Sequence, residues 1–112
     1  MKKIEDKDIL EFATFCIGCL SHILNLPQEE VYKRLEDSGI LHGYIVECYD
    51  VLHTFGSKYL MNDLIDFMKE KGVLESDREY KVTTEQILNV ESVMYYKEGE
   101  KENKKYTKLN YK

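Results

Sequence analysis

The stretch from residue 44 to residue 72 constrains the fold more than any other part of the sequence. It predicts an amphipathic helix over residues 58–71, with an apolar stripe on one face and charged or amide side chains on the other. Ser57 can cap the start of that helix, and Gly72 can end it because glycine adopts the left-handed conformation without strain. The stripe consists of Leu60, Met61, Leu64, Ile65, Phe67 and Met68. This pattern specifies a fold much more clearly than it specifies a reaction.

Two further helices are predicted upstream of this stretch. Apolar residues recur at spacings of three and four over residues 7–25, which predicts a helix with Asp6 or Asp8 as its cap. Pro27 suits the first position of a second helix, 27–37, because the missing N–H is not needed there. The connection between the two helices is only a few residues long. We therefore expect them to pack as an antiparallel or steeply crossed pair.

The segment that follows the second helix is less regular in sequence. Residues 40–47 fit either an extended stretch or a helical turn, because their β-branched residues favour a strand while Gly43 favours a bend. Residues 49–54 predict a short helix that ends at Gly56. The apolar faces of the three main helices predict a core built from Phe12, Cys16, Leu20, Ile23, Leu35, Leu52, Leu64, Ile65 and Met68.

The predicted fold class is mainly α, a small helical bundle with a C-terminal extension. We assign residues 1–75 to the helical domain and residues 76–112 to the extension, because the composition becomes polar after Glu75. Thr83 and Gln86 have the spacing of a capping box, which predicts a helix from residue 84 onward.

The end of the extension has two interpretations. Residues 93–97 and 105–111 are rich in tyrosine, valine and methionine around a polar turn, which slightly favours a β-hairpin. The alternative is a continued helix followed by a partly disordered tail. A lone hairpin is marginal in water, so it would need the helical body or a partner to hold it.

Length, charge and cysteine content exclude several classes of protein. The 112 residues suffice for one core, and their net charge is −5. Residues 1–90 hold 10 Lys and Arg against 17 Asp and Glu, which argues against broad phosphate-backbone binding and suits a basic protein partner.

No apolar run reaches the roughly 18 residues of a membrane span, and the N-terminus does not resemble a signal peptide. Three cysteines suit a reducing compartment, so we expect a cytoplasmic protein.

Resemblance to a known family is carried by three runs of sequence: FATFCIGCLSHILNLPQEEVYKRLEDSGIL, YDVLHTFG and LMNDLIDFMKEKG. They resemble the short bacterial proteins grouped as domain of unknown function 3791, over about residues 8–74. The resemblance implies no established activity. Members are often found near genes for ADP-ribosyltransferase-like toxins, so the resemblance implies an antitoxin or a similar interaction role. The tail of this chain departs from the family pattern, in which many members end near the position of Gly72.

A compact polar cluster, Tyr49, Asp50 and His53, is the first candidate site. Asp50 and His53 are one helical turn apart, a spacing that lets a carboxylate fix an imidazole tautomer for acid–base chemistry. The simpler interpretation is that the two side chains satisfy each other at a tight helix junction. Surface recognition by the three residues is the intermediate alternative. Cys48 would point away from both in a helix, so a nucleophilic triad is not favoured.

Two other clusters contain residues that can carry chemistry. Cys16, Cys19 and His22 lie close in sequence, but one helix would hold Cys16 and His22 about 120° apart, so we expect core packing and no metal. In the tail, Tyr95, Tyr96 and Tyr106 are interleaved with lysines, which suits either a partner-binding surface or a solvated extension.

Three functions from different classes follow. The favoured one is a non-catalytic, antitoxin-like interaction module that binds a protein partner through Tyr49, Asp50, His53, Tyr95, Tyr96 and Tyr106. The second is a nucleic-acid-binding regulator that uses residues 45–71 as a helix-turn-helix, although the presumed reading helix carries three lysines against three acids. The third is a small enzyme that uses Asp50 and His53. We predict no catalytic, metal or cofactor site, and the sequence leaves the oligomeric state open, a homodimer included.

Overall fold

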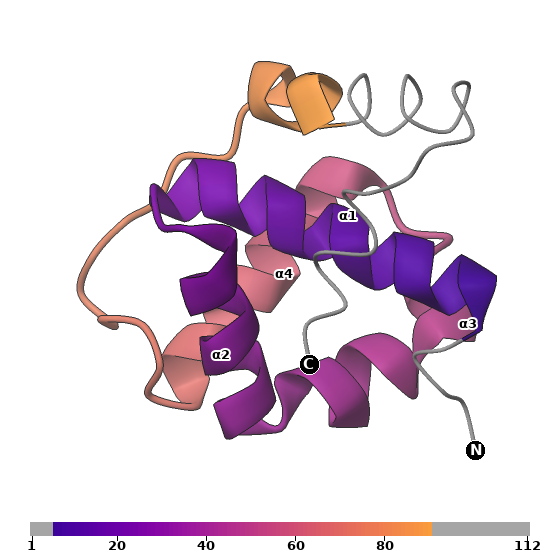
Figure 1. Ribbon diagram of the computed structural model, residues 1–112. Helices are drawn as coiled ribbons and strands as arrows, with labels where there is room; N and C mark the ends of the chain where they lie inside the picture. Colours follow the sequence, from indigo (N-terminus) through magenta and orange to yellow (C-terminus); the bar gives the residue numbers. More distant parts are fainter. Residues whose placement is uncertain (1–5, 91–112) are drawn as a thin grey trace.

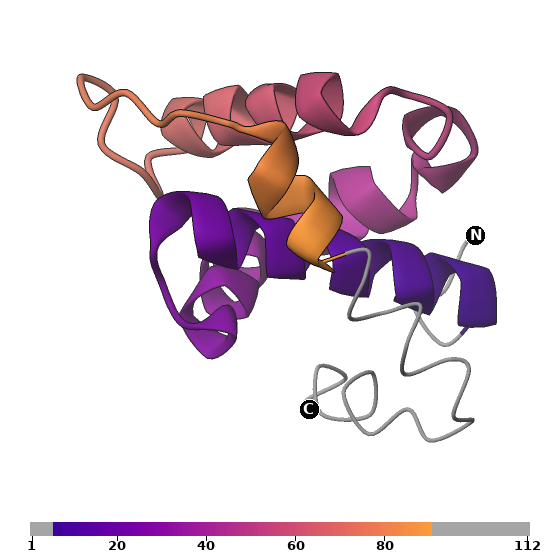
Figure 2. The ribbon, with the colours of Figure 1, turned by 90° about the horizontal axis from the view of Figure 1, so that it is seen from above.

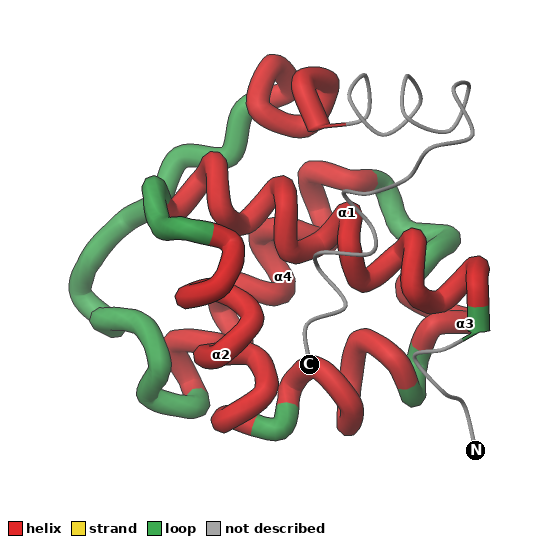
Figure 3. Tube along the Cα trace, in the orientation of Figure 1, coloured by secondary structure: helices red, strands yellow, loops and turns green. Residues whose placement is uncertain are grey.

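The computed structural model describes residues 6–90, and every regular element in that range is helical (Figures 1 and 3). The elements are α1 (Lys7–Leu24), α2 (Gln28–Ser38), the π-helix η1 (Leu41–Val46), α3 (Tyr49–Leu52) and α4 (Ser57–Glu70), followed by a short helix over residues 84–90. The mainly α prediction is confirmed. The β-hairpin expected over residues 93–97 and 105–111 lies outside the described residues.

Helix α1 begins and ends where the local chemistry predicts. The carboxylate of Asp6 accepts hydrogen bonds from the backbone N–H groups of Asp8, at 3.0 Å, and Ile9, at 3.4 Å. Those N–H groups have no partner inside the helix, so the cap stabilises its first turn. Asn25 ends the helix in the left-handed conformation, at φ 58°. Asp6 is therefore confirmed as the N-cap.

The chain changes direction sharply after Asn25, and α2 is bent by 112° relative to α1. This confirms the steeply crossed arrangement. Pro27 lies one residue before the first residue of α2 and not within the helix. Over residues 6–90, no single helix has the length and composition of a membrane span, although α1 and α2 taken together pass that test as a bent pair.

The ambiguous segment after α2 is a π-helix. Ile40, just before η1, and Leu41, Ile45 and Val46 within it are buried, so two adjacent pairs lie five residues apart. Hydrogen bonding from residue i to residue i+5 brings such pairs to the same side, whereas an α-helix would separate them. Burial of both pairs therefore accounts for the wider turn. The β-branched residues that favour a strand are accommodated here as core residues of a helix.

The start of α4 corrects one prediction. Ser57 is the first helical residue, and Gly56 occupies the capping position with an extended backbone, at φ −64° and ψ 144°. No side chain caps this end, so the capping role assigned to Ser57 is wrong. A tight turn ends the helix as expected, since Gly72 has φ 79° and the N–H of Val73 donates to the carbonyl of Met68 at 3.0 Å.

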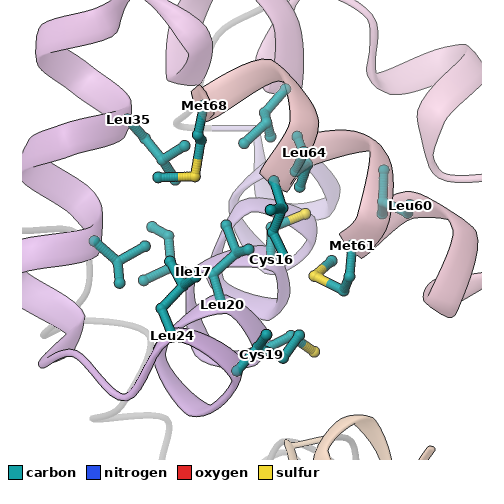
Figure 4. Packing of buried hydrophobic residues seen from close by; sticks show 14 of the residues in the cluster. Cys16, Ile17, Cys19, Leu20, Leu24, Leu35, Leu60, Met61, Leu64 and Met68 are labelled. Carbon is teal, nitrogen blue, oxygen red and sulfur yellow. The ribbon is translucent and has the colours of Figure 1, made fainter. Parts of the chain in front are cut away.

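The core lies between α1, α2, η1 and α4 (Figure 4). Eight of the nine predicted core residues are buried, namely Cys16, Leu20, Ile23, Leu35, Leu52, Leu64, Ile65 and Met68. Phe12 is the exception, because its ring is only partly buried and packs edge-on against Tyr49 at the surface. Its place in the predicted core is therefore corrected to a position at the core's edge.

The chain after residue 75 adds to the same core. Val82, Ile87 and Val90 are buried with the residues of the helical body, and the helix over residues 84–90 lies across α1 (Figures 1 and 2). A side-chain Cβ built on Gly18 of α1 would lie 3.1 Å from Val90 Cγ1. Because glycine has no such atom, the two helices approach closely at this point.

The helix over residues 84–90 begins with the predicted capping box. The N–H of Thr83 donates to Gln86 Oε1 at 2.9 Å, and the N–H of Gln86 donates to Thr83 Oγ1 at 3.2 Å. These reciprocal bonds satisfy two N–H groups at the start of a short helix. The capping-box prediction is confirmed.

Candidate partner-binding surfaces

Two aromatic rings stack at the surface where α3 meets α1. The rings of Tyr49 and His53 lie 4.3 Å apart between centroids and are nearly parallel, at 9°. Phe12 of α1 packs edge-on against Tyr49, with a centroid distance of 5.4 Å and an angle of 73°. His53 is exposed, and Tyr49 and Phe12 are partly buried. We call these three residues the α3 patch.

Several carboxylates lie near Tyr49 of the α3 patch. The pKa of the Tyr49 hydroxyl is raised first by burial and then by the negative charges of nearby acidic residues, namely Asp8, Asp6, Asp50 and Glu11. Three of these carboxylates belong to the start of α1 and its cap, and Asp50 belongs to α3. The patch therefore combines stacked aromatic rings with nearby acidic residues, one of which, Glu11, is paired with Lys7 at 3.0 Å.

The backbone fixes the imidazole of His53. Its Nδ1 lies 2.7 Å from the carbonyl oxygen of Tyr49. A carbonyl can only accept, so Nδ1 carries the proton and donates. The tautomer is thus set by the main chain one turn earlier, and Asp50 is not needed at Nδ1. Acid–base chemistry by an Asp50–His53 pair loses its main structural argument, which was orientation of this ring by the carboxylate.

A second surface lies between η1 and α4. Tyr44 donates its hydroxyl proton to Asp63 at 2.7 Å, and its ring packs edge-on against Phe67 at a centroid distance of 5.0 Å. The hydrogen bond to Asp63 and burial raise the pKa of Tyr44 to about 12. These three residues line an open groove together with Asp66, Lys69, Glu70 and Ser76. We call its aromatic and acidic residues, Tyr44, Asp63, Asp66, Phe67 and Glu70, the acidic groove.

The role of Tyr49, Asp50 and His53 in partner binding stays a prediction, and the second surface was not predicted from the sequence. Tyr49, Asp50 and His53 do lie together on α3, and the structure adds Phe12 to them. Tyr44 and Asp63 are nineteen residues apart, and only the π-helix brings Tyr44 against α4. No local spacing marks such a pair. The tail residues Tyr95, Tyr96 and Tyr106 lie outside the described range.

The cysteines do not form a site within the described residues. Cys16 and Cys19 are completely buried while His22 is exposed, so the three side chains do not converge. Over residues 6–90, no group of three or more His, Cys, Asp or Glu residues is placed to hold a metal ion. None of the three cysteines is in a disulfide, and burial raises the pKa of the Cys16 thiol well above its ordinary value. The two cysteines of the C-x-x-C motif therefore pack in the hydrophobic core.

The fold and its surfaces define a small, all-helical protein over the described range, with two aromatic and acidic surfaces. The sequence matches DUF3791, a family described as a protein of unknown function, over residues 11–71. The chain therefore belongs to the DUF3791 family. No curated protein and no solved structure matches it. The match includes both surfaces and ends before the buried residues Leu74, Val82, Ile87 and Val90.

Proposed function

We propose that this protein is a non-catalytic interaction module that binds a basic segment of a protein partner through the α3 patch. The observation that carries the proposal is the stacked Tyr49–His53 pair, which is partly open to solvent and has acidic residues near Tyr49. Tyrosine supplies a large contact area at a low cost in conformational entropy, and here two contacts hold its ring before any partner binds. Such preorganised aromatic residues are typical of the residues that dominate protein interfaces.

Charge supports a basic partner. Residues 6–90 contain 8 Lys and Arg against 16 Asp and Glu. A surface of one sign accelerates encounter with a partner of the opposite sign and repels nucleic acid. The antitoxin-like role implied by the family resemblance fits this scheme, since an acidic protein in the cytoplasm can cover a basic surface of a toxin.

The nucleic-acid alternative has weaker support. In residues 45–71, the exposed positions of α4 include Lys58, Asn62, Asp66 and Glu70. A reading helix must approach phosphates, which requires a local excess of cations. The two carboxylates oppose that approach. Exposed carboxylates attract positive groups, so a protein surface with exposed cations is the favoured partner.

Co-expression with the product of the neighbouring gene, followed by size-exclusion chromatography, tests the proposal. The wild type should elute as a complex, and Tyr49→Ala should weaken that complex by about thirtyfold or more, as loss of a dominant interface residue does. Tyr59→Ala is a matched control, because Tyr59 is 62% exposed and packs edge-on against Phe55 outside the α3 patch.

Two outcomes would contradict the proposal. The first is a complex that survives Tyr49→Ala and His53→Ala unchanged. The second is a reaction catalysed by the free protein that His53→Ala abolishes while the circular dichroism spectrum stays that of the wild type. The second result would return Asp50 and His53 to the role of an acid–base pair.

A further inference from the structure

The acidic groove has a charge pattern that costs stability. Asp63, Asp66 and Glu70 follow one another at spacings of three and four on α4, so like charges face each other on one side of the helix. Each such pair destabilises a helix by about 0.2–0.5 kcal/mol. The side-chain carboxylates of Asp66 and Glu70 make no hydrogen bond or ion pair with any residue in the described range. The Tyr44 hydroxyl and the nearby Lys69 offset part of this charge, and the negative charge that is left can attract a cation.

Aromatic rings form the apolar part of the same groove. Tyr44 and Phe67 pack edge to face at 87°, and the 2.7 Å hydrogen bond from Tyr44 to Asp63 joins one ring to the carboxylate row. The groove has a volume of about 720 Å³. That volume is in the range of pockets that hold a small ligand, and the groove is open to solvent. The contacts of Tyr44 with Asp63 and Phe67 hold the walls of the groove in place.

Cations already lie over the aromatic rings in this region. Lys71 Nζ is 5.7 Å from the centroid of Phe67, and Lys69 Nζ is 5.7 Å from that of Tyr80. The guanidinium of Arg78 lies 5.1 Å from the Tyr80 centroid. These distances are those of cation–π contacts. The ring faces near the groove thus accept positive groups, and a partner's cation can compete for the same positions.

Chemistry distinguishes among the cations that could occupy the groove. Its carboxylates are not placed to hold a metal ion. A guanidinium is planar, stacks on an aromatic face and pairs with carboxylates through a fork of donors, whereas an ammonium is a strongly hydrated point charge. A groove that combines ring faces with two unpaired carboxylates therefore suits arginine better than lysine.

We propose that the acidic groove binds an arginine-bearing segment of a partner protein, with the guanidinium stacked on Phe67 and paired with Asp66 or Glu70. This site is separate from the α3 patch, so it does not depend on the function proposed above. The groove and the patch can engage one partner at two points or act alone.

Matched peptides test the proposal on the full-length protein. Three fluorescein-labelled octapeptides share a glycine and serine sequence and carry two arginines, two lysines or two citrullines. Fluorescence anisotropy should show the arginine peptide binding about tenfold more tightly than the lysine peptide, because the two differ in stacking and bidentate pairing and not in charge. The citrulline peptide has the shape of arginine without its charge and should not bind measurably.

Variants locate the binding site. Asp66→Asn with Glu70→Gln should weaken the arginine peptide by about tenfold. Glu29→Gln with Glu85→Gln removes the same net charge from exposed positions on other helices and should change binding by less than about twofold. Phe67→Leu should bring the arginine and lysine peptides to similar affinities. Thermal melts of each variant show whether the fold is intact.

Several results would overturn the inference. They are equal affinity for the arginine and lysine peptides, an equal loss in the two double variants, or no binding of the arginine peptide up to millimolar concentration. Tyr49→Ala should bind the peptides as the wild type does. Failure of the groove and failure of the α3 patch are therefore separate outcomes.

Discussion

Helix α4 and the helix over residues 84–90 both lie beside α1, yet they differ in how they are held. Helix α4 has fourteen residues and buries Leu60, Met61, Leu64, Ile65 and Met68. The helix over residues 84–90 contributes Ile87 and Val90, and it reaches the body through a stretch without regular secondary structure. The first lies inside the family match and the second outside it. The core is therefore built as an inner layer of α1, α2, η1 and α4 with an outer layer over residues 72–90.

A pair of cavity-forming substitutions should separate the two layers. Leu64 has no exposed surface, so Leu64→Ala should destabilise the protein by about 2 to 5 kcal/mol. Ile87→Ala should cost about 2 kcal/mol or less, because a short helix at the edge can move to fill the space. Urea melts of both variants measure the difference. Equal losses would mean that the outer layer is as tightly packed as the inner one.

Thiol alkylation should report the inner layer alone. Cys16 lies among core residues of α1 and α4 (Figure 4), and burial raises its pKa, so little thiolate forms and no reagent reaches it. Cys48 is partly exposed and should react first. Mass spectrometry after iodoacetamide treatment should find Cys16 modified only under conditions that unfold the whole protein. Rapid modification of Cys16 in Ile87→Ala would show that the outer layer protects the inner one.

Metal analysis extends the cysteine prediction. Because Cys16 and Cys19 are buried away from His22, protein purified without chelator or affinity-tag metal should contain no stoichiometric zinc or iron. One bound metal per chain that disappears on changing Cys16 and Cys19 to Ser would overturn this expectation.

Gly18→Ala should act on the contact between the layers. Alanine favours a helix interior by about 1 kcal/mol over glycine, but the new methyl group would lie 3.1 Å from Val90 Cγ1. The two effects oppose each other, so global stability should change by less than about 1 kcal/mol. Amide exchange should nevertheless become faster over residues 84–90 than in the wild type. Val90→Ala in the same variant should restore protection, and its failure to do so would place the strain elsewhere.

The smallest expected effect is a pH dependence at the hydrogen bond between Tyr44 and Asp63, because Tyr44 is only partly buried and solvent screens the interaction. Tyr44 donates to Asp63 only while its hydroxyl is protonated, and its pKa is about 12 in the folded protein against about 10 in an unfolded chain. The folded state thus keeps a proton that the unfolded state loses over this range. The stabilisation is complete below about pH 10 and disappears as the pH rises through about 12.

Comparison with Tyr44→Phe isolates this contribution. The stability difference between wild type and variant should shrink between about pH 10 and pH 12, and the near-ultraviolet absorbance of the variant should lack one late-titrating tyrosine. A difference that stays constant over that range would mean that the hydrogen bond to Asp63 does not stabilise the fold.

Local rules predicted the features that depend on neighbouring residues. Asp6 as a cap, the turn at Gly72 and the capping box of Thr83 and Gln86 each involve contacts within five residues. Their geometry follows from backbone groups that need partners at helix ends. The mainly α fold and most of the core follow in the same way, because periodicity records which face of a helix is apolar.

Features set by tertiary packing were not predictable. The π-helix buries two pairs of residues five apart on one side, and the sequence does not show which side of that segment faces the core. Phe12 has the spacing of a core residue, but Tyr49 meets it at the surface. The acidic groove depends on contacts between Tyr44, Asp63 and Phe67, which only the assembled fold brings together.

The absence of a side chain at Gly18 has a consequence for sequence variation. A glycine inside α1 costs helix stability, and the close approach of Val90 offsets that cost because a larger residue would crowd it. A relative that ends at the position of residue 71 has no such neighbour. Selection on helix stability should then favour alanine or a larger residue at this position. The identity of residue 18 should therefore vary together with the presence of the downstream helix, and an alignment of DUF3791 proteins of different lengths would show this association.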